Sequence, residues 1–265
     1  MPHPLRWHCH DLAAHVPPDD VAGHVAVIID VLRASTTITT ALAHGAAGVR
    51  PMLTVEEARA AAGPGVVLGG ERGCVRISGF DLGNSPLEYL PDRVAGRQVV
   101  ITTTNGTAAL ERCRAAREVL VGAMVNRSAV ARAVRALAVR CGSRDVHLVC
   151  AGTDGAVSGD DVLTAGAILD AAAADPGAVG DEFDMPARAA LQSFAAVRDH
   201  GEPPERAIEE VFRHALGGRN LVALGMAADL KAAAAIDTLT VVPRLEHATG
   251  WLHAFHQHQA ATAPA

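Results

Sequence analysis

The sequence predicts an α/β protein in which a mixed, largely parallel sheet lies between two layers of helices. Short apolar runs rich in β-branched residues, such as 25–29 (VAVII) and 98–102 (QVVIT), alternate with longer segments of helical pattern. An unbroken apolar run is typical of a strand buried on both faces, as in a parallel sheet covered by helices. Polar loops follow several of these runs. We therefore expect a layered α/β/α fold with a crevice at the carboxyl ends of its strands.

Residues 5–12 form a short predicted strand inside a region rich in histidine. Metal ligands need a rigid surrounding shell, and chain ends are usually poorly ordered. We therefore expect the terminal histidines to be solvated and without function. They are His3, His8, His10 and His15 near the N-terminus and His253, His256 and His258 near the C-terminus.

The remaining elements follow from apolar runs, helix caps and glycine or proline stops. Thr54-Val55-Glu56-Glu57 is a capping box, and Ser85 before Pro86 predicts an N-cap and a first helical residue. Gly217 and Gly218 predict the end of a helix. The predicted strands lie at 25–29, 48–53, 66–68, 98–102, 119–121, 146–150 and 238–242, and the predicted helices at 35–45, 54–63, 87–90, 108–114, 128–140, 162–174, 185–198 and 204–216.

Composition favours a protein that acts on a small molecule. The formal net charge is -6 and the arginines are spread along the chain, so no surface for nucleic acid or anionic membrane is indicated. With 49% hydrophobic residues, we expect one domain over 1–246, either undivided or as two lobes meeting at the crevice, and a flexible tail over 247–265. Neither a signal peptide nor a membrane span is predicted, which favours the cytoplasm.

Cysteine and lysine usage excludes several site types. The five cysteines contain no C-x-x-C pair, which argues against a disulfide framework and against a zinc ribbon. The one lysine, Lys231, has no G-x-x-x-x-G-K-[ST] motif around it, which excludes a Walker-type nucleotide site. Anion binding must therefore depend on arginine, hydroxyl groups and backbone amides.

The loop after the strand 25–29 carries the first candidate site. Asp30 ends the strand, Arg33 follows, and the hydroxyl residues Ser35 and Thr36 begin the next helix. Free N–H groups at a helix start and the helix dipole favour anions at such a position. An ordinary helix cap is the alternative for this loop taken alone.

Two further strand ends have similar loops. Glu71 and Arg72 follow the strand 66–68 among glycines that permit close backbone approach. Asn84 and Ser85 lie at the next helix start. The strand 98–102 leads into a loop of hydroxyl, amide and glycine residues that can bind anionic oxygens: Thr103, Thr104, Asn105, Gly106 and Thr107.

A fourth loop adds two adjacent acids. Gly152 and Thr153 follow the strand 146–150, and Asp160 and Asp161 stand at the head of the next helix. They are either ordinary partners of the helix dipole or Mg²⁺ ligands, since Mg²⁺ usually takes only one or two carboxylates and completes its shell with water and phosphate oxygens. Arg219 could reach the crevice, or could form a structural salt bridge.

Together these loops resemble the 2-phosphosulfolactate phosphatase family, the magnesium-dependent phosphatases of coenzyme M biosynthesis. The resemblance covers the chain from about Val25 to Pro243 and implies the family's own α/β fold, a Mg²⁺ cofactor and a phosphorylated 2-hydroxy acid as substrate. The matching segments are IDVLRAST (Ile29–Thr36), GERG (Gly70–Gly73), GFDLGNSP (Gly79–Pro86), TTTNGT (Thr102–Thr107), CAGT (Cys150–Thr153), the pair Asp160-Asp161 and GRNL (Gly218–Leu221).

The chain departs from the family at two places. The family usually has a bulky residue and then Glu-Asp where this chain has Gly159-Asp160-Asp161, which shortens the first acid by one methylene. GERG is followed here by Cys74. Family members also occur where coenzyme M is not made, so a different, non-sulfonated hydroxy acid phosphate is an alternative substrate.

The sequence excludes known covalent phosphatase motifs. It contains no C-x5-R, no D-x-D and no R-H-G. Asp30 attacking phosphorus and attack by a metal-bound water both stay open. A non-catalytic binder or sensor, and an isomerase or phosphotransferase, are the alternative functions. A homodimer is expected from base rates alone.

The resulting hypothesis gives each candidate residue a role. Mg²⁺ is held by Asp30, Glu71 and one or both of Asp160 and Asp161, and it clamps a phosphate oxygen. Arg33 and Arg72 grip the phosphate or the carboxylate of the substrate. The catalytic set is Asp30, Arg33, Glu71 and Asp161, and the substrate-binding set is Ser35, Thr36, Arg72, Asn84, Ser85, Thr103, Thr104, Asn105, Gly106, Thr107, Gly152, Thr153 and Arg219.

Overall fold

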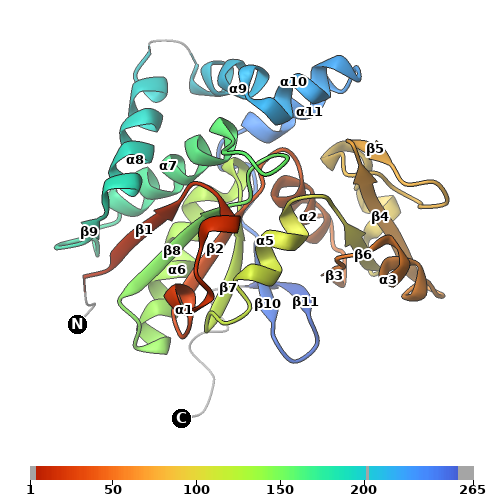
Figure 1. Ribbon diagram of the computed structural model, residues 1–265, viewed down its shortest axis with the longest axis horizontal. Helices are drawn as coiled ribbons and strands as arrows, with labels where there is room; N and C mark the ends of the chain where they lie inside the picture. Colours follow the sequence, from red (N-terminus) through yellow and green to blue (C-terminus); the bar gives the residue numbers. More distant parts are fainter. Residues whose placement is uncertain (1–3, 201–202, 256–265) are drawn as a thin grey trace.

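The structure, a computed structural model, describes residues 4–200 and 203–255, and within them eleven strands form one sheet (Figure 1). The order across the sheet is β5-β4-β6-β3-β11-β10-β7-β2-β8-β1-β9. The strands are β1 (Arg6–His10), β2 (Val25–Ile29), β3 (Gly48–Pro51), β4 (Val66–Arg72), β5 (Val75–Arg76), β6 (Gln98–Thr102), β7 (Glu118–Gly122), β8 (Asp145–Cys150), β9 (Glu182–Phe183), β10 (Val242–Glu246) and β11 (Trp251–Phe255).

The sheet has two parallel groups joined by an antiparallel hairpin. Strands β4, β6 and β3 pair in parallel, and so do β7, β2, β8, β1 and β9. Between them lies the hairpin β10–β11, which meets β7 through Arg244 opposite Leu120 and meets β3 through Leu252 opposite Val49. The predicted mixed, largely parallel sheet is confirmed.

Helices cover both faces of the sheet, which confirms the predicted α/β/α layering (Figure 1). Helices α6, α7 and α8 pack on one face, and α1, α2 and α5 pack on the other. The α-helices of the described residues are α1 (Pro18–Val21), α2 (Ala34–Ala43), α3 (Val55–Ala60), α4 (Pro91–Val94), α5 (Gly106–Arg112), α6 (Arg127–Cys141), α7 (Gly159–Ala173), α8 (Met185–Arg198), α9 (Pro204–His214), α10 (Leu216–Ala223) and α11 (Ala227–Ala234).

Strand β2 shows why an unbroken apolar run belongs at the centre of this sheet. All five of its residues are buried. Val25, Val27 and Ile29 contribute to the core on the α6–α7 face, whereas Ala26 and Ile28 contribute to the core on the α2–α5 face. Successive side chains of a strand point to opposite faces, so both faces must be apolar when helices cover both.

Local capping signals are confirmed where they act within a few residues. Thr54 accepts a hydrogen bond from the backbone of Glu57 while Glu57 bonds back to the Thr54 backbone, so the capping box is present. Ser85 accepts from the backbone of Leu87 and caps a short 3-10 helix, Pro86–Glu88.

Helices α9, α10 and α11 lie over the end of the sheet where the polar loops gather (Figure 1). The prediction that Gly217 and Gly218 end a helix is wrong, because both lie in the first turn of α10. A Cβ at Gly218 would come within 1.8 Å of the Phe212 carbonyl oxygen. Glycine is therefore needed here for the close approach of two helices rather than for a helix stop.

Two predictions near the C-terminus are also corrected. Strand β10 begins at Val242, where the predicted strand 238–242 ends, and residues 251–255 of the predicted flexible tail form β11 inside the sheet. The register of the β10–β11 hairpin places Leu252 opposite Leu245, and both are buried. Only a tertiary pairing could show that this segment is ordered.

The N-terminal histidines are more ordered than expected. His8 and His10 lie on β1, and each ring stacks with His147 of β8, at centroid distances of 4.7 and 5.3 Å. Burial first, and then neighbouring histidines, lower the pKa of His147 to about 3, so its ring is neutral at pH 7. His15 is exposed as expected, whereas His3, His256 and His258 lie outside the described residues.

In the described part of the chain, no helix is both long enough and apolar enough to cross a membrane.

Candidate active site

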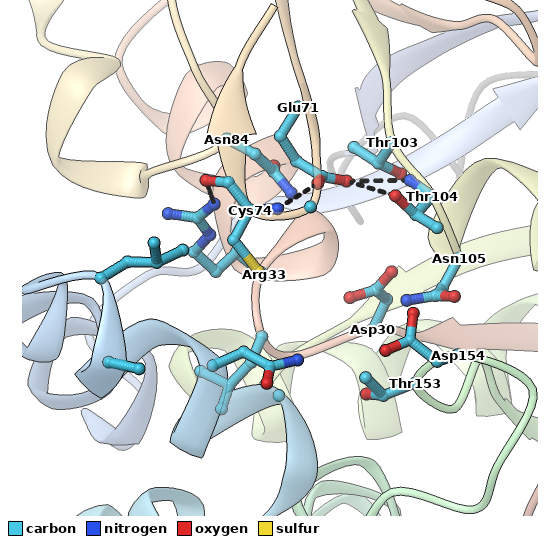
Figure 2. A pocket seen from close by; sticks show the side chains of 16 residues that line it. Asp30, Arg33, Glu71, Cys74, Asn84, Thr103, Thr104, Asn105, Thr153 and Asp154 are labelled. Atoms are coloured by element: carbon cyan, nitrogen blue, oxygen red, sulfur yellow. Dashed lines mark hydrogen bonds between the residues drawn. The ribbon is translucent and has the colours of Figure 1, made fainter.

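A cavity of about 310 Å³ lies where the loops after β2, β4, β6 and β8 meet helix α10. We call it the central pocket. Residues from four sequence-distant loops line it, as the spacing of the polar loops predicts. The candidate residues that line it are Asp30, Arg33, Glu71, Asn84, Thr103, Thr104, Asn105 and Thr153 (Figure 2).

Asp30 is a buried acid that directly follows β2. It is 6% exposed and lines the pocket, and its Oδ1 receives only a long hydrogen bond of 3.4 Å from the Ala34 backbone. Burial, followed by the charges of Asp160 and Glu71, raises the pKa of Asp30 to about 7, against the lowering effect of backbone N–H groups at Ala34 and Gly106. A cation beside this carboxylate would relieve the energetic cost of its charge.

Gly106 allows the start of α5 to approach Asp30. A Cβ at this position would lie 2.7 Å from Asp30 Oδ2 and 2.9 Å from the Ala34 Cβ, closer than side chains tolerate. The missing side chain of Gly106 therefore permits this approach, and the predicted contact between Gly106 and substrate stays a prediction.

Replacing Gly106 with alanine should displace the Asp30 carboxylate and lower kcat by roughly a hundredfold, the effect expected of a misplacement near 1 Å. The measurement is kcat together with the thermal unfolding temperature. Gly63→Ala is the matched control, since a Cβ at Gly63 meets nothing within 4 Å. Unchanged kcat in the Gly106 variant would contradict the proposed approach.

Glu71 joins two of the loops. Its Oε1 accepts hydrogen bonds from the Thr104 backbone at 2.9 Å and from the Thr104 hydroxyl at 3.0 Å, and its Oε2 accepts one from the Cys74 backbone at 2.8 Å (Figure 2). Glu71 is 6% exposed and lines the pocket. Three donors hold Glu71 in place, so its first role is to fix the loops after β4 and β6 relative to each other.

Asp161 is a similar brace between two other loops. Its Oδ1 accepts from the Val31 backbone at 2.8 Å and its Oδ2 from the Gly152 backbone at 2.9 Å. Both oxygens are thus engaged, and Asp161 does not line the pocket. In the described structure Asp161 holds these two loops together, and its predicted catalytic role stays a prediction. Burial, and then the charges of Asp160 and Asp30, raise the pKa of Asp161 well above its usual range.

Asp160 lies just behind the pocket wall. It is 1% exposed and accepts a hydrogen bond from the Ser158 hydroxyl. Its Oδ2 lies 3.7 Å from where a Cβ of Gly217 would stand, and Gly217 lines the pocket. The negative charge of Asp160 helps to raise the pKa of Asp30. Of the two adjacent acids, Asp160 is the one whose oxygen faces the pocket wall.

Arg33 is the one cationic side chain among the described residues that line the central pocket, and it is already paired. Its Nη1 donates to Asp229 Oδ2 at 2.8 Å and to the sulfur of Met226 at 3.2 Å, and its Nη2 donates to the Cys74 carbonyl at 2.8 Å. A guanidinium has five N–H donors. Three are used within the described structure, which leaves the Nε–H and one Nη2–H for an oxyanion.

Several predicted substrate contacts lie outside the central pocket. Arg72 is exposed and donates to Thr102 Oγ1 at 3.0 Å and to backbone carbonyls, and Arg219 is exposed and donates to the His214 carbonyl at 2.6 Å. Neither lines the pocket. The other predicted contacts with inward structural roles are Ser35, Thr36, Ser85, Thr107 and Gly152, which bond Asp30 N, Val31 O, Asp229 Oδ1, Thr103 O and Asp161 Oδ2 respectively.

The chain is similar to known proteins over most of its length. The family model described as 2-phosphosulpholactate phosphatase matches residues 11–248. The chain belongs to the 2-phosphosulfolactate phosphatase family. A relative from Deinococcus radiodurans is 45% identical over 232 residues, 86% of this chain and 90% of the relative. A relative from Thermotoga petrophila is 39% identical over 229 residues, 86% of this chain and 92% of the relative. Both are named probable 2-phosphosulfolactate phosphatases.

In this member of the phosphatase family, the pocket has features that suit a Mg²⁺ ion. Asp30, Glu71 and Asp154 line it, against the single guanidinium of Arg33, so an added cation would offset the excess of acidic side chains. Buried Asn84 Oδ1 and Thr103 Oγ1 lack a partner within the structure. No cluster of three or more acidic, histidine or cysteine side chains in the described ranges is arranged to hold a metal. Mg²⁺ needs only one or two carboxylates, so Asp30 together with the unpartnered oxygens of Asn84 and Thr103 fits such an ion.

Sequence reasoning missed three residues of this phosphatase site. Asp154 and Asn220 line the pocket, and Asp229 pairs with Arg33. Asp154 could have been found as the acid of an Asp-Gly turn directly after a strand, and Asn220 as the neighbour of Arg219 in the GRNL segment. Asp229 carries no local signal, because its partner lies 196 residues away in the chain.

Proposed function

We propose that this chain is a Mg²⁺-dependent phosphatase that hydrolyses 2-phosphosulfolactate to sulfolactate and phosphate, as in coenzyme M biosynthesis. The observation that carries the proposal is the central pocket, in which four loops bring Asp30, hydroxyl and amide groups and Arg33 together. Family membership supports the reaction class. The five cysteines have no disulfide partners, which is in keeping with a cytoplasmic enzyme.

The residues divide the work by their positions. Asp30 would hold Mg²⁺, and the nearby negative charges of Asp160 and Glu71 would add to the attraction for the ion. The ion when bound would neutralise charge on the phosphate oxygens. Thr103 and Asn84 offer buried polar atoms that have no other partner. Arg33 offers its two remaining donors to a second acid group of the substrate.

The size and chemistry of the pocket favour a short aliphatic ester. Its volume is about 310 Å³, and no aromatic side chain of the described residues lines it. A nucleotide would need a stacking surface for its base or an extended cleft. The apolar part of the wall comes from Leu32, Ala223 and Leu224.

Release of inorganic phosphate from 2-phosphosulfolactate is expected in the presence of Mg²⁺ and should stop when EDTA is added. The assay measures free phosphate with and without the chelator, and with Mg²⁺ restored. Binding without release of phosphate would instead indicate a sensor of phosphorylated acids. Faster release from non-sulfonated hydroxy acid phosphates would correct the substrate while keeping the reaction.

A further inference from the structure

The loop after β8 ends in a rigid tight turn. Thr153 and Ala156 exchange backbone hydrogen bonds of 2.9 and 3.0 Å, and between them Asp154 and Gly155 have positive φ values of 52° and 77°. Two central residues with positive φ are typical of a type I′ turn, for which Asp-Gly is a preferred sequence. A Cβ at the preceding Gly152 would lie 2.5 Å from the Ala156 carbonyl oxygen, so the two ends of the turn pack closely against each other.

This turn presents Asp154 to the central pocket. Asp154 lines the pocket and is exposed to solvent. In Figure 2 its carboxylate lies on the same side of the pocket as Asp30 and Asn105, with Arg33 and Cys74 on the other side. The described structure contains no hydrogen bond or ion pair to the Asp154 carboxylate, so both of its oxygens are free to accept a proton or bind water.

The neighbouring acids are less suited to this task. Glu71 and Asp161 use both oxygens to hold loop N–H and hydroxyl groups, and Asp160 lies behind the pocket wall. Asp30 is buried beneath α5. Asp154 combines an open carboxylate, a fixed backbone and contact with bulk water. These properties suit a general base, which must lie within hydrogen-bond reach of the water molecule whose proton it takes.

We propose that Asp154 is the general base of the reaction, an inference that rests on the proposed phosphatase function. As a water oxygen bonds to phosphorus, one proton of that water passes to the Asp154 carboxylate. The ester P–O bond breaks, the alcohol oxygen takes a proton from solvent, and Asp154 returns its proton to solvent. The sum is ester plus water giving alcohol plus inorganic phosphate. Asp154 can act as the base in either of two routes. The water attacks the phosphorus of the ester directly, or it attacks a phosphoryl group that Asp30 has first taken from the ester.

Replacement of Asp154 by asparagine and by glycine tests this role, because both of these residues adopt positive φ readily. Asp154→Asn keeps the shape and removes the base, and Asp154→Gly keeps the turn and opens space for a small external carboxylate. We expect kcat to fall by roughly 10²–10⁴-fold in both variants, with a small change in KM. Formate should restore activity to the glycine variant in proportion to its concentration, and chloride at equal ionic strength should not. Formate should leave the asparagine variant inactive.

Controls separate this inference from the proposed function. Asp92→Asn changes an exposed acid that does not line the pocket and should leave kcat unchanged. Binding of Mn²⁺ as a probe, measured by calorimetry, should be the same in wild type and Asp154→Asn. Near-normal kcat in the asparagine variant, no formate rescue of the glycine variant, or Mn²⁺ binding weakened tenfold would each overturn the assignment. Absence of phosphate release by the wild type would instead contradict the phosphatase function itself.

Discussion

Replacing Asp30 with asparagine is expected to lower kcat by on the order of a hundredfold or more and, in the same variant, to stabilise the metal-free protein. Activity falls because the variant loses a carboxylate that lines the pocket. Stability rises because Asp30 is 6% exposed and its carboxylate is repelled by the charges of Asp160 and Glu71. Steady-state kinetics and denaturant unfolding in EDTA measure the two effects.

The stabilisation by Asp30→Asn should depend on pH. The pKa of Asp30 is raised from 3.8 to about 7 in the folded protein, so the folded state binds more protons than the unfolded state between these values. The free energy of unfolding of the wild type should therefore fall as pH rises from about 4 to about 7. The asparagine variant lacks this contribution, and its advantage should be small near pH 4 and largest above pH 7.

Asp19→Asn, which removes an exposed acid from the first turn of α1, is the control for the Asp30 variant. It should leave kcat unchanged. Near-normal turnover in Asp30→Asn would remove Asp30 from the reaction. An advantage of Asp30→Asn that stayed constant across pH would contradict the raised pKa.

Replacing Asp229 with alanine is expected to destabilise the protein by about 3–5 kcal/mol. The side chains of Arg33 and Asp229 are 3% and 4% exposed and lie 2.8 Å apart. Removing the acid leaves the guanidinium buried without its counter-charge, and also removes the acceptor of the Ser85 hydroxyl at 2.6 Å. Arg33 lines the pocket and is held there by Asp229 of α11. Loss of Asp229 should therefore raise KM as well.

A double variant separates the cost of an unpaired charge from the loss of packing. Arg33→Met combined with Asp229→Leu should recover much of the stability lost by Asp229→Ala, since replacing both partners by apolar groups leaves no buried charge. It should not recover activity. Glu210→Ala removes a partner of Arg213 and His214 from an exposed cluster and should change stability much less. Equal destabilisation by Glu210→Ala and Asp229→Ala would contradict the argument from burial.

Most elements could be predicted because their signals act over a few residues. The apolar run 25–29 forms β2, and the capping box at Thr54 starts α3. The polar loops after β2, β4, β6 and β8 do line one pocket, since the chain places hydroxyl and carboxylate residues at strand ends repeatedly. The pairing of residues 251–255 with Val242–Glu246 could not be predicted, because it depends on partners in the sheet.

The roles of individual charged residues were harder to predict. Arg72 and Asp161 have the residue types of a phosphate site, yet the backbone and side chains around them use their donor and acceptor atoms. Asp154 has an ordinary type and position, yet its carboxylate is open to the pocket. Residue type states what a side chain can bind, whereas the fold decides which of its atoms are already bound.

The sequence by itself determined the layered α/β fold, the family and the set of loops that form the site, because apolar periodicity, caps and motifs are local properties of the chain. Only the tertiary structure decided which acids face the pocket, that Arg33 is neutralised by Asp229, and that the β10–β11 hairpin joins the two parallel groups. These features depend on contacts between segments far apart in the chain. Burial and hydrogen bonding at such contacts set the chemistry of each side chain.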